Sequence, residues 1–174
     1  MSTIVASRQT LEVRTPRIHA GDWSSAWTLA VAEAEPVFVP VHGYTDDRGW
    51  SYMNLLNGVL APEGQVNFSA QYPGVVKAWH RHRHQTDFWM CVTGNLKAGV
   101  YREDDGAAWC VVIGEKRPGV LVIPPTLWHG ATPVGPTTAG LLYYVTRAYD
   151  ARQPDEERRS WDGIEGFPWE ARHG

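Results

Sequence analysis

The chain has 174 residues, of which 43% are hydrophobic and 20% charged, and its formal net charge is −3. This length suits one domain with its own core, and the composition is that of a globular protein, not a disordered one. The slightly acidic balance argues against nucleic acid as a partner, because nucleic-acid binders present a strongly basic face. No apolar run approaches the roughly 20 residues that a membrane helix needs, and residues 1–14 contain no secretory signal. We therefore expect a cytoplasmic protein whose Cys91 and Cys110 remain buried thiols.

The first 35 residues differ in pattern from the rest of the chain. We expect an N-terminal extension over 1–35 and a single domain over 36–174. Asp22, followed by Trp23-Ser24-Ser25, predicts a helix that runs to about Glu35. An Asp at the cap accepts hydrogen bonds from the free amides of the first turn.

From Pro36 onward, short apolar runs alternate with Gly, Pro, Asn and Asp, which is typical of an all-β domain. So many short strands in one domain favour a double-sheet jelly roll or a small barrel, whose interior can hold one small ligand. The charged tail after Tyr149 ends in three large rings (Trp161, Phe167 and Trp169), so we expect it to dock on the domain. The predicted strands are Val37–Val41, Gly49–Leu55, Gln65–Gln71, Val75–His82, Asp87–Val92, Leu96–Arg102, Trp109–Ile113, Gly119–Ile123 and Ala139–Val145.

The predicted strand that ends near His82 carries the most informative pattern. His80, His82 and His84 alternate with Arg81 and Arg83, and side chains two apart share one face of a strand. For as long as the strand lasts, the imidazoles therefore gather on one face. Such a group forms either an acid–base site or a metal site, while His84 can equally be a solvated turn residue.

The metal alternative has its own spacing. It resembles the first motif of metal-binding cupins, with Asp in place of the usual Glu. The pattern is Gly74, five residues, His80-x-His82, four residues, Asp87, six residues and Gly94. His129 would be the fourth ligand. Imidazoles with a carboxylate suit Fe(II), Mn, Zn or Ni.

Six segments in the same order resemble the dTDP-4-dehydrorhamnose 3,5-epimerase group of the cupin superfamily. Together they span about 40–169, and they imply a cupin-type jelly roll. The segments are Asp46-Asp47-Arg48-Gly49-Trp50, Gln65-Val66-Asn67-Phe68-Ser69, Gly74-Val75-Val76-Lys77-Ala78-Trp79-His80, Ile123-Pro124-Pro125-Thr126-Leu127-Trp128-His129-Gly130, Leu142-Tyr143-Tyr144 with Tyr149-Asp150, and Ser160-Trp161-Asp162.

The resemblance implies a role for each matching residue. His80 would be the general base, Asp162 its carboxylate partner and Tyr143 the general acid. The residues implied to contact the sugar or the diphosphate are Arg48, Trp50, Gln65, Asn67, Lys77 and His129. The partners implied are a nucleotide-diphosphate sugar and a second copy in a homodimer that shares an N-terminal strand. No cofactor is implied.

This chemistry suits the residue types. A carbon next to a ketone is acidified because its carbanion is an enolate, and a histidine can take that proton near neutral pH. A tyrosine on the opposite face of the sugar can return a proton there, which inverts the centre. Tyr143 and Asp162 also have structural alternatives, as a core ring and as a turn residue.

The match is incomplete at three places. Asp87 stands where the family has a lysine that stabilises the enolate oxygen, and a carboxylate there would repel an enolate unless a metal or histidine intervenes. Lys77 replaces an arginine and loses its bidentate fork. Met53 stands near the position of a missing glutamate, and the added His82 and His84 are atypical of the rhamnose pathway.

Three functions therefore remain open from the sequence. The first is an epimerase or isomerase acting next to the ketone of a nucleotide-linked 4-keto-6-deoxy sugar. The second is a metal-dependent cupin enzyme, an oxygenase or isomerase, that uses His80, His82, Asp87 and His129. The third is a sugar-binding cupin without turnover, because one fold can carry different sites.

Overall fold

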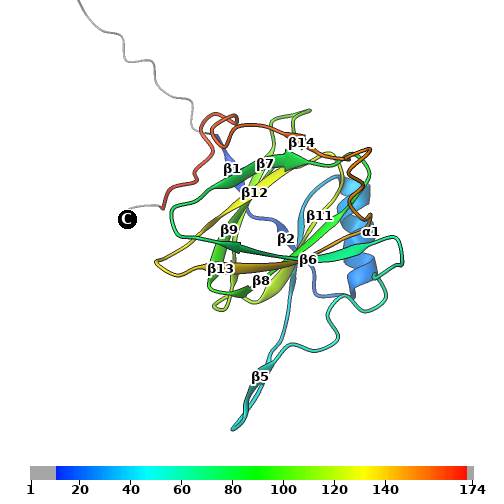
Figure 1. The fold of residues 1–174 in the computed structure, drawn as a ribbon, viewed down its shortest axis with the longest axis vertical. Helices are drawn as coiled ribbons and strands as arrows, with labels where there is room; N and C mark the ends of the chain where they lie inside the picture. The colour runs from blue at the N-terminus through cyan, green and yellow to red at the C-terminus, as the bar shows by residue number, and fades with distance from the viewer. Residues whose placement is uncertain (1–10, 172–174) are drawn as a thin grey trace, which may run out of the picture.

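The computed structural model describes residues 11–171 and contains two six-stranded sheets, a hairpin and one helix. In sheet A the spatial order is β1 (Val13–Arg14), β10 (Ala108–Gly114), β9 (Asn95–Tyr101), β12 (Trp128–Pro133), β7 (Lys77–Arg81) and β14 (Glu157–Arg158). In sheet B it is β2 (Arg17–Ile18), β3 (Val37–Pro40), β11 (Gly119–Ile123), β8 (Asp87–Thr93), β13 (Ala139–Val145) and β6 (Gln65–Gln71). The two sheets face each other as a jelly roll (Figure 1), which confirms the predicted cupin-type fold.

The main core lies between the two sheets. It contains apolar side chains from both, among them Phe38, Trp89, Leu96, Ile113 and Leu121. These residues alternate with outward-facing ones along their strands, and that alternation made the strands predictable.

The helix α1 (Trp23–Glu33) covers the outer face of sheet B (Figure 1). Asp22 caps it as predicted, because its Oδ1 accepts a 2.8 Å hydrogen bond from the Ser25 amide. Ala26 and Ala30 are fully buried against the sheet. Before this helix in the chain, β1 and β2 each pair in parallel with a strand of a different sheet, so the extension covers one edge of both. The domain boundary at residue 35 stays a prediction.

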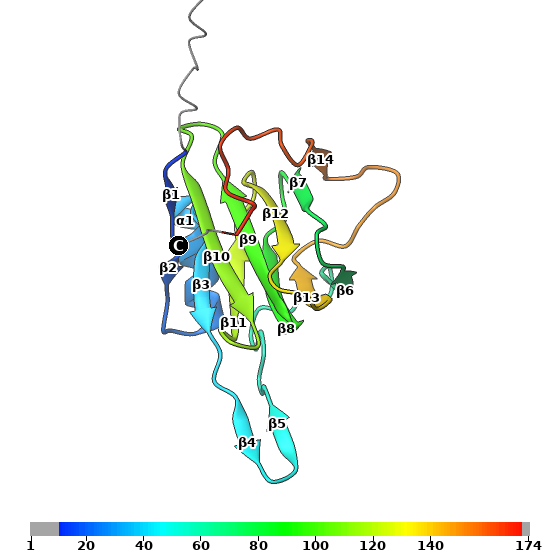
Figure 2. The same ribbon diagram turned by 90° about the vertical axis from the view of Figure 1, so that its left-hand side faces the viewer.

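The C-terminal segment docks on the outer face of sheet A (Figure 2). Trp79 lies 4.7 Å, centroid to centroid, from both Phe167 and Trp169. The prediction of three docked rings is wrong for Trp161, whose side chain is exposed. Its backbone carbonyl instead accepts hydrogen bonds from the indole N–H groups of Trp79 and Trp169.

Two predicted strands are shorter in the structure. The run expected over Gly49–Leu55 ends at Ser51 as β5 (Gly49–Ser51), which pairs with β4 (Tyr44–Asp46) in a hairpin that projects from the body (Figure 2). The run expected over Val75–His82 is reduced to β7, Lys77–Arg81. His82 and His84 therefore lie beyond the strand, and strand alternation alone does not orient them.

One central strand was missed. β12 contains Gly130 and ends at Pro133, and it lacks the β-branched run that marks a strand. Gly130 is needed there because a Cβ would lie 2.3 Å from the Ala78 Cβ on β7. Within residues 11–171 no helix is long and apolar enough to cross a membrane.

Candidate functional site: a histidine and carboxylate cluster in a polar pocket

A pocket of about 930 Å³ opens between the two sheets. It lies at the side where β6 is the edge strand of sheet B and β7 is next to the edge strand of sheet A. Its walls come from β6, β7, β8 and β13, and from the connection 146–156 between β13 and β14. The lining is rich in imidazole, amide, carboxylate and cationic groups. Such a lining suits a polar ligand.

Four side chains meet beside this pocket: His80, His82 and Asp87 line it, and His129, which does not line it, lies buried against them. His80 on β7 lies directly opposite His129 on β12, and their ring centroids are 4.2 Å apart. Asp87 reaches the group from sheet B, as the first residue of β8. One potential ligand atom from each residue lies within 4.8 Å of the others. We call these four residues the histidine cluster.

Hydrogen bonds orient two of the imidazoles. The Nδ1 of His129 lies 2.8 Å from the Leu127 carbonyl, and the Nδ1 of His82 contacts the Asp155 carbonyl. Because a carbonyl only accepts, both Nδ1 atoms carry a proton, and the Nε2 of each ring points away from that carbonyl. The side chain of His129 is only 2% exposed.

The Nε2 of His129 is a buried polar atom without a hydrogen-bond partner among the described residues. Its neighbour is Asp87 Oδ2, 3.6 Å away. Asp87 accepts hydrogen bonds from Gln85 Nε2 at 2.9 Å and from Trp89 Nε1 at 3.1 Å. A buried acceptor pair at this distance is unfavourable unless a proton or a cation lies between them.

The electrostatics favour a neutral His80 near a charged Asp87. Burial lowers the pKa of His80 well below its usual range and His129 lowers it further, while Asp87 opposes both. Burial raises the pKa of Asp87, but the adjoining His129 and the charges of His82 and His80 outweigh it, so this pKa falls to about 2. Burial, and then Asp87, raise the pKa of Tyr143. At neutral pH, His80 is therefore a proton acceptor and Tyr143 keeps its proton.

The histidine cluster also fits a divalent transition metal. Three imidazoles and one carboxylate are the donor set that suits Zn, Fe(II), Mn or Ni. The hydrogen bonds from His129 and His82 to backbone carbonyls are of the kind that orients metal-ligating imidazoles. The unpartnered Nε2 of His129 is the atom that such an ion would satisfy.

The structure brings several predicted site residues into the pocket. Tyr143 lies on β13, and its neighbour Tyr144 instead packs in the layer under α1. Gln65 and Asn67 line the pocket from β6. Lys77 reaches from β7 across to β6, where its Nζ donates to Ser69 Oγ at 3.0 Å. The pocket also includes His84, which is exposed.

Three predicted residues lie elsewhere. Arg48 and Trp50 are on the projecting hairpin, where the Arg48 side chain is 85% exposed and is ion-paired to Asp46. Asp162 is exposed in the C-terminal segment and accepts a hydrogen bond from Ser160. Asp162 is not among the pocket-lining residues, and no described contact joins it to His80. The carboxylate beside His80 is Asp87.

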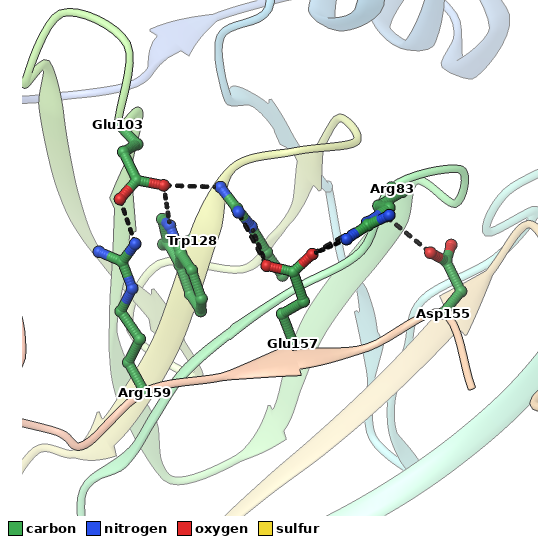
Figure 3. Close-up of polar contacts among 7 residues, drawn as sticks. Arg83, Glu103, Trp128, Asp155, Glu157 and Arg159 are labelled. Carbon is green, nitrogen blue, oxygen red and sulfur yellow. Dashed lines mark hydrogen bonds and ion pairs between the residues drawn. The ribbon is translucent and has the colours of Figure 1, made fainter. Parts of the chain in front are cut away.

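An arginine network holds one wall of the pocket in place (Figure 3). Glu157 on β14 pairs with Arg81 at 2.8 Å and with Arg83 at 2.7 Å. The guanidinium groups of Arg81 and Arg159 lie 4.5 Å and 4.1 Å from the ring centre of Trp128. These contacts fasten β14 to β7, so the connection that precedes β14 is anchored at its end.

The sequence analysis missed several pocket residues in the connection 146–156 and beside the histidine cluster. They are Gln85, Arg147, Gln153, Asp155 and Glu156. The connection has no strand alternation, and the sequence does not indicate which of its side chains turn inward. Gln85 could have been considered, since it stands two residues before Asp87.

The fold and the site define a cupin-type jelly roll with a polar pocket built on a His, His, Asp and His cluster. Residues 44–157 match the model of the polysaccharide biosynthesis C-terminal domain family, and the chain belongs to this family. It is 37% identical over 135 residues to the spore coat polysaccharide biosynthesis protein SpsL of Bacillus subtilis, covering 72% of this chain and 89% of SpsL. It is 43% identical over 101 residues to the probable low-salt glycan biosynthesis epimerase Agl13 of Haloferax volcanii, covering 55% of this chain and 65% of Agl13.

Solved structures confirm the fold that the resemblance implied. A dTDP sugar isomerase from Desulfovibrio desulfuricans superposes with a TM-score of 0.69 at 23% identity, over 77% of this chain and 90% of that one. The dTDP-6-deoxy-D-glucose-3,5-epimerase of Legionella pneumophila, solved with dTDP-4-keto-L-rhamnose, gives a TM-score of 0.64 at 19% identity. That match covers 76% of this chain and 77% of the Legionella chain.

Proposed function

We propose that the protein is an epimerase that removes and returns a proton next to the ketone of a nucleotide-linked 4-keto-6-deoxy sugar. The observation that carries this proposal is the placement of His80 and Tyr143, which line one pocket from opposite sheets. The names of Agl13 and of the two solved sugar-nucleotide enzymes support the same class of reaction.

The acid and base follow from the protonation states. His80 is unprotonated at neutral pH because its pKa is lowered, so it can accept the proton of the carbon next to the ketone. The electron pair moves onto the ketone oxygen as an enolate. Tyr143 keeps its proton because its pKa is raised, and it can deliver that proton to the other face of the sugar. The loss on one face and the return on the other invert the carbon.

The carboxylate partner of the base is assigned to Asp87 in place of Asp162. Asp87 is 2% exposed and belongs to the histidine cluster, so its charge can stabilise the imidazolium that forms on His80. Asp162 is exposed and bonded to Ser160. The Asp162 assignment would require the C-terminal segment to move.

Polar residues at the pocket mouth are proposed to hold the rest of the substrate. Gln65 and Asn67 offer amides from β6, and their side chains are hydrogen-bonded to each other at 2.5 Å. Lys77 carries a cationic group at the same edge, which suits a diphosphate. His129 is fully buried in the cluster, so we assign it to the cluster and not to the diphosphate.

We also propose a homodimer in which the hairpin completes the partner's pocket. Arg48 and Trp50 contact substrate in the resemblance, yet here they lie on a hairpin that projects away from the body (Figure 2). Trp50 is 60% exposed, and among residues 11–171 its ring contact is with Tyr52, with centroids 5.0 Å apart and ring planes tilted by 56°. A second copy is the arrangement that brings such residues to a pocket. Mixing an Arg48→Ala protein with a Tyr143→Phe protein should then restore activity.

The histidine cluster favours a second version of the same site. The unpartnered Nε2 of His129 and the oriented ring of His82 fit a divalent transition metal held with His80 and Asp87. A bound metal would supply a Lewis acid for a substrate oxygen. His80 would then be a ligand, and the base would have to come from elsewhere in the pocket. The cytoplasm remains the proposed location, because two cysteines are too few for the disulfide framework of a small secreted domain.

The test is deuterium wash-in from heavy water into 4-keto-6-deoxy sugar nucleotides, followed by NMR. Tyr143→Phe should lower the rate of inversion, followed in the same spectra, about 10²-fold or more, because inversion needs a proton from the other face. Tyr144→Phe is the matched control, because Tyr144 bonds the Ala61 amide away from the pocket, and it should keep the rate. Equal rates in the two variants would refute the acid role. Metal content of protein prepared without metal-affinity resin then separates the two versions: about one ion per chain favours the metal version, and none favours the metal-free version.

A further inference from the structure

Asp155 makes an unusual set of contacts at the end of the connection 146–156. Its carboxylate oxygens accept 2.9 Å hydrogen bonds from the backbone amides of Arg83 and His84. Its backbone carbonyl accepts from Nδ1 of His82. One residue therefore contacts all three members of the turn 82–84 that follows β7, and Figure 3 shows Asp155 beside Arg83.

This turn carries a member of the histidine cluster but has no strand to orient it. β7 ends at Arg81, so the ladder of sheet A does not reach His82. The backbone of His82 is held through its carbonyl, which accepts a 2.6 Å hydrogen bond from Thr126. The ring itself can still rotate, and its orientation depends on the carbonyl of Asp155.

We propose that Asp155 is a positioning residue for the histidine cluster. Its carboxylate fixes the turn, and its carbonyl then keeps the proton of His82 on Nδ1, so that the Nε2 lone pair points at the cluster. The proposal concerns the pocket of the proposed function and deepens it. Asp155 also lies near the end of the connection 146–156, which lines the pocket through Arg147 and Gln153. A substrate in the pocket would therefore contact the same connection that orients His82.

The fold around Asp155 can survive its replacement. Arg83 is also fastened to Glu157, whose Oε1 accepts hydrogen bonds from its Nε and Nη2 at 2.9 and 2.7 Å. Glu157 pairs with Arg81 as well. These ion pairs keep β14 on β7 without Asp155, so its loss should disturb the ring of His82 more than the sheet.

The experiment compares Asp155→Ala with a matched control, Asp105→Ala. Asp105 also holds a turn through a backbone amide, that of Ala107 at 3.1 Å, and it is not among the residues that line the pocket. Long-range ¹H–¹⁵N NMR on the metal-free proteins reports which nitrogen of His82 carries the proton. Competition with a coloured chelator measures the affinity for Zn²⁺ alone.

We expect the wild type and Asp105→Ala to show His82 protonated on Nδ1, and Asp155→Ala to lose this single state. The affinity for Zn²⁺ should fall about 10- to 100-fold in Asp155→Ala only. Asp155→Asn keeps one acceptor oxygen, so its affinity for Zn²⁺ should lie between those of the wild type and Asp155→Ala. It provides a second variant if Asp155→Ala does not fold.

The same His82 state and the same Zn²⁺ affinity in all the proteins would overturn the proposal. A wild-type His82 protonated on Nε2 would overturn it as well. Neither measurement uses a sugar nucleotide. Failure of deuterium wash-in would thus count against the proposed epimerase and leave this test intact.

Discussion

Replacing Asp87 by Asn should change how the stability of the fold depends on pH. The carboxylate of Asp87 is 2% exposed, and its pKa is about 2, against an ordinary value of 3.8. Because this pKa is depressed in the folded state, the ionised group stabilises the fold at pH values above its pKa in the unfolded chain. This stability is lost as the pH falls through the pKa of the folded state. The difference of almost two units corresponds to about 2.5 kcal/mol. Of this stabilisation, about 1 kcal/mol should be lost by pH 3 and about 2 kcal/mol by pH 2.

The assay is urea unfolding of wild type and Asp87→Asn in a chelator, at several pH values from about 6 down to 2.5. The Asn side chain keeps the shape, so subtracting the two curves reports the effect of the Asp87 charge, which below about pH 5 is dominated by its own titration. The wild type should lose its advantage over the variant steadily below about pH 4, and the two should run parallel above about pH 5. A difference between the proteins that does not change with pH would refute the stated electrostatics. It would mean that the His129 and Asp87 pair does not favour the ionised carboxylate.

Three further predictions follow from the structure. Trp79→Ala should destabilise the fold by about 3–5 kcal/mol in urea unfolding and expose the C-terminal segment to protease, because Trp79 is the buried contact of Phe167 and Trp169; a loss below about 1 kcal/mol would contradict that packing. Asp22→Ala should cost about 1 kcal/mol through the lost helix cap while leaving deuterium wash-in unchanged, whereas a fall in activity would tie the extension to the site. Cys91 should react with a thiol reagent far more slowly than a free cysteine at pH 8, because burial raises its pKa to about 11, and rapid labelling in the folded protein would contradict its burial.

The sequence by itself determined most of the strands, the helix cap and the candidate chemistry. Strands such as β6 and β8 were predictable because their apolar residues follow the pleat or form short buried runs between turn residues. The N-cap at Asp22 is a local interaction over three residues, so local sequence suffices. His80-x-His82 marked the site because the residue types and their close spacing limit the chemistry that they can perform.

Tertiary structure decided which of those residues meet. Asp87 faces the pocket only because the turn after β7 keeps the register of β8, and a slip by one residue would have turned it away. His129 joins His80 through the pairing of β12 with β7, a strand that its own sequence did not reveal. The carboxylate beside His80 is Asp87 and not Asp162, and Arg48 lies on a projecting hairpin. These outcomes depend on long-range pairing and on packing summed over the whole chain, which a local pattern does not contain.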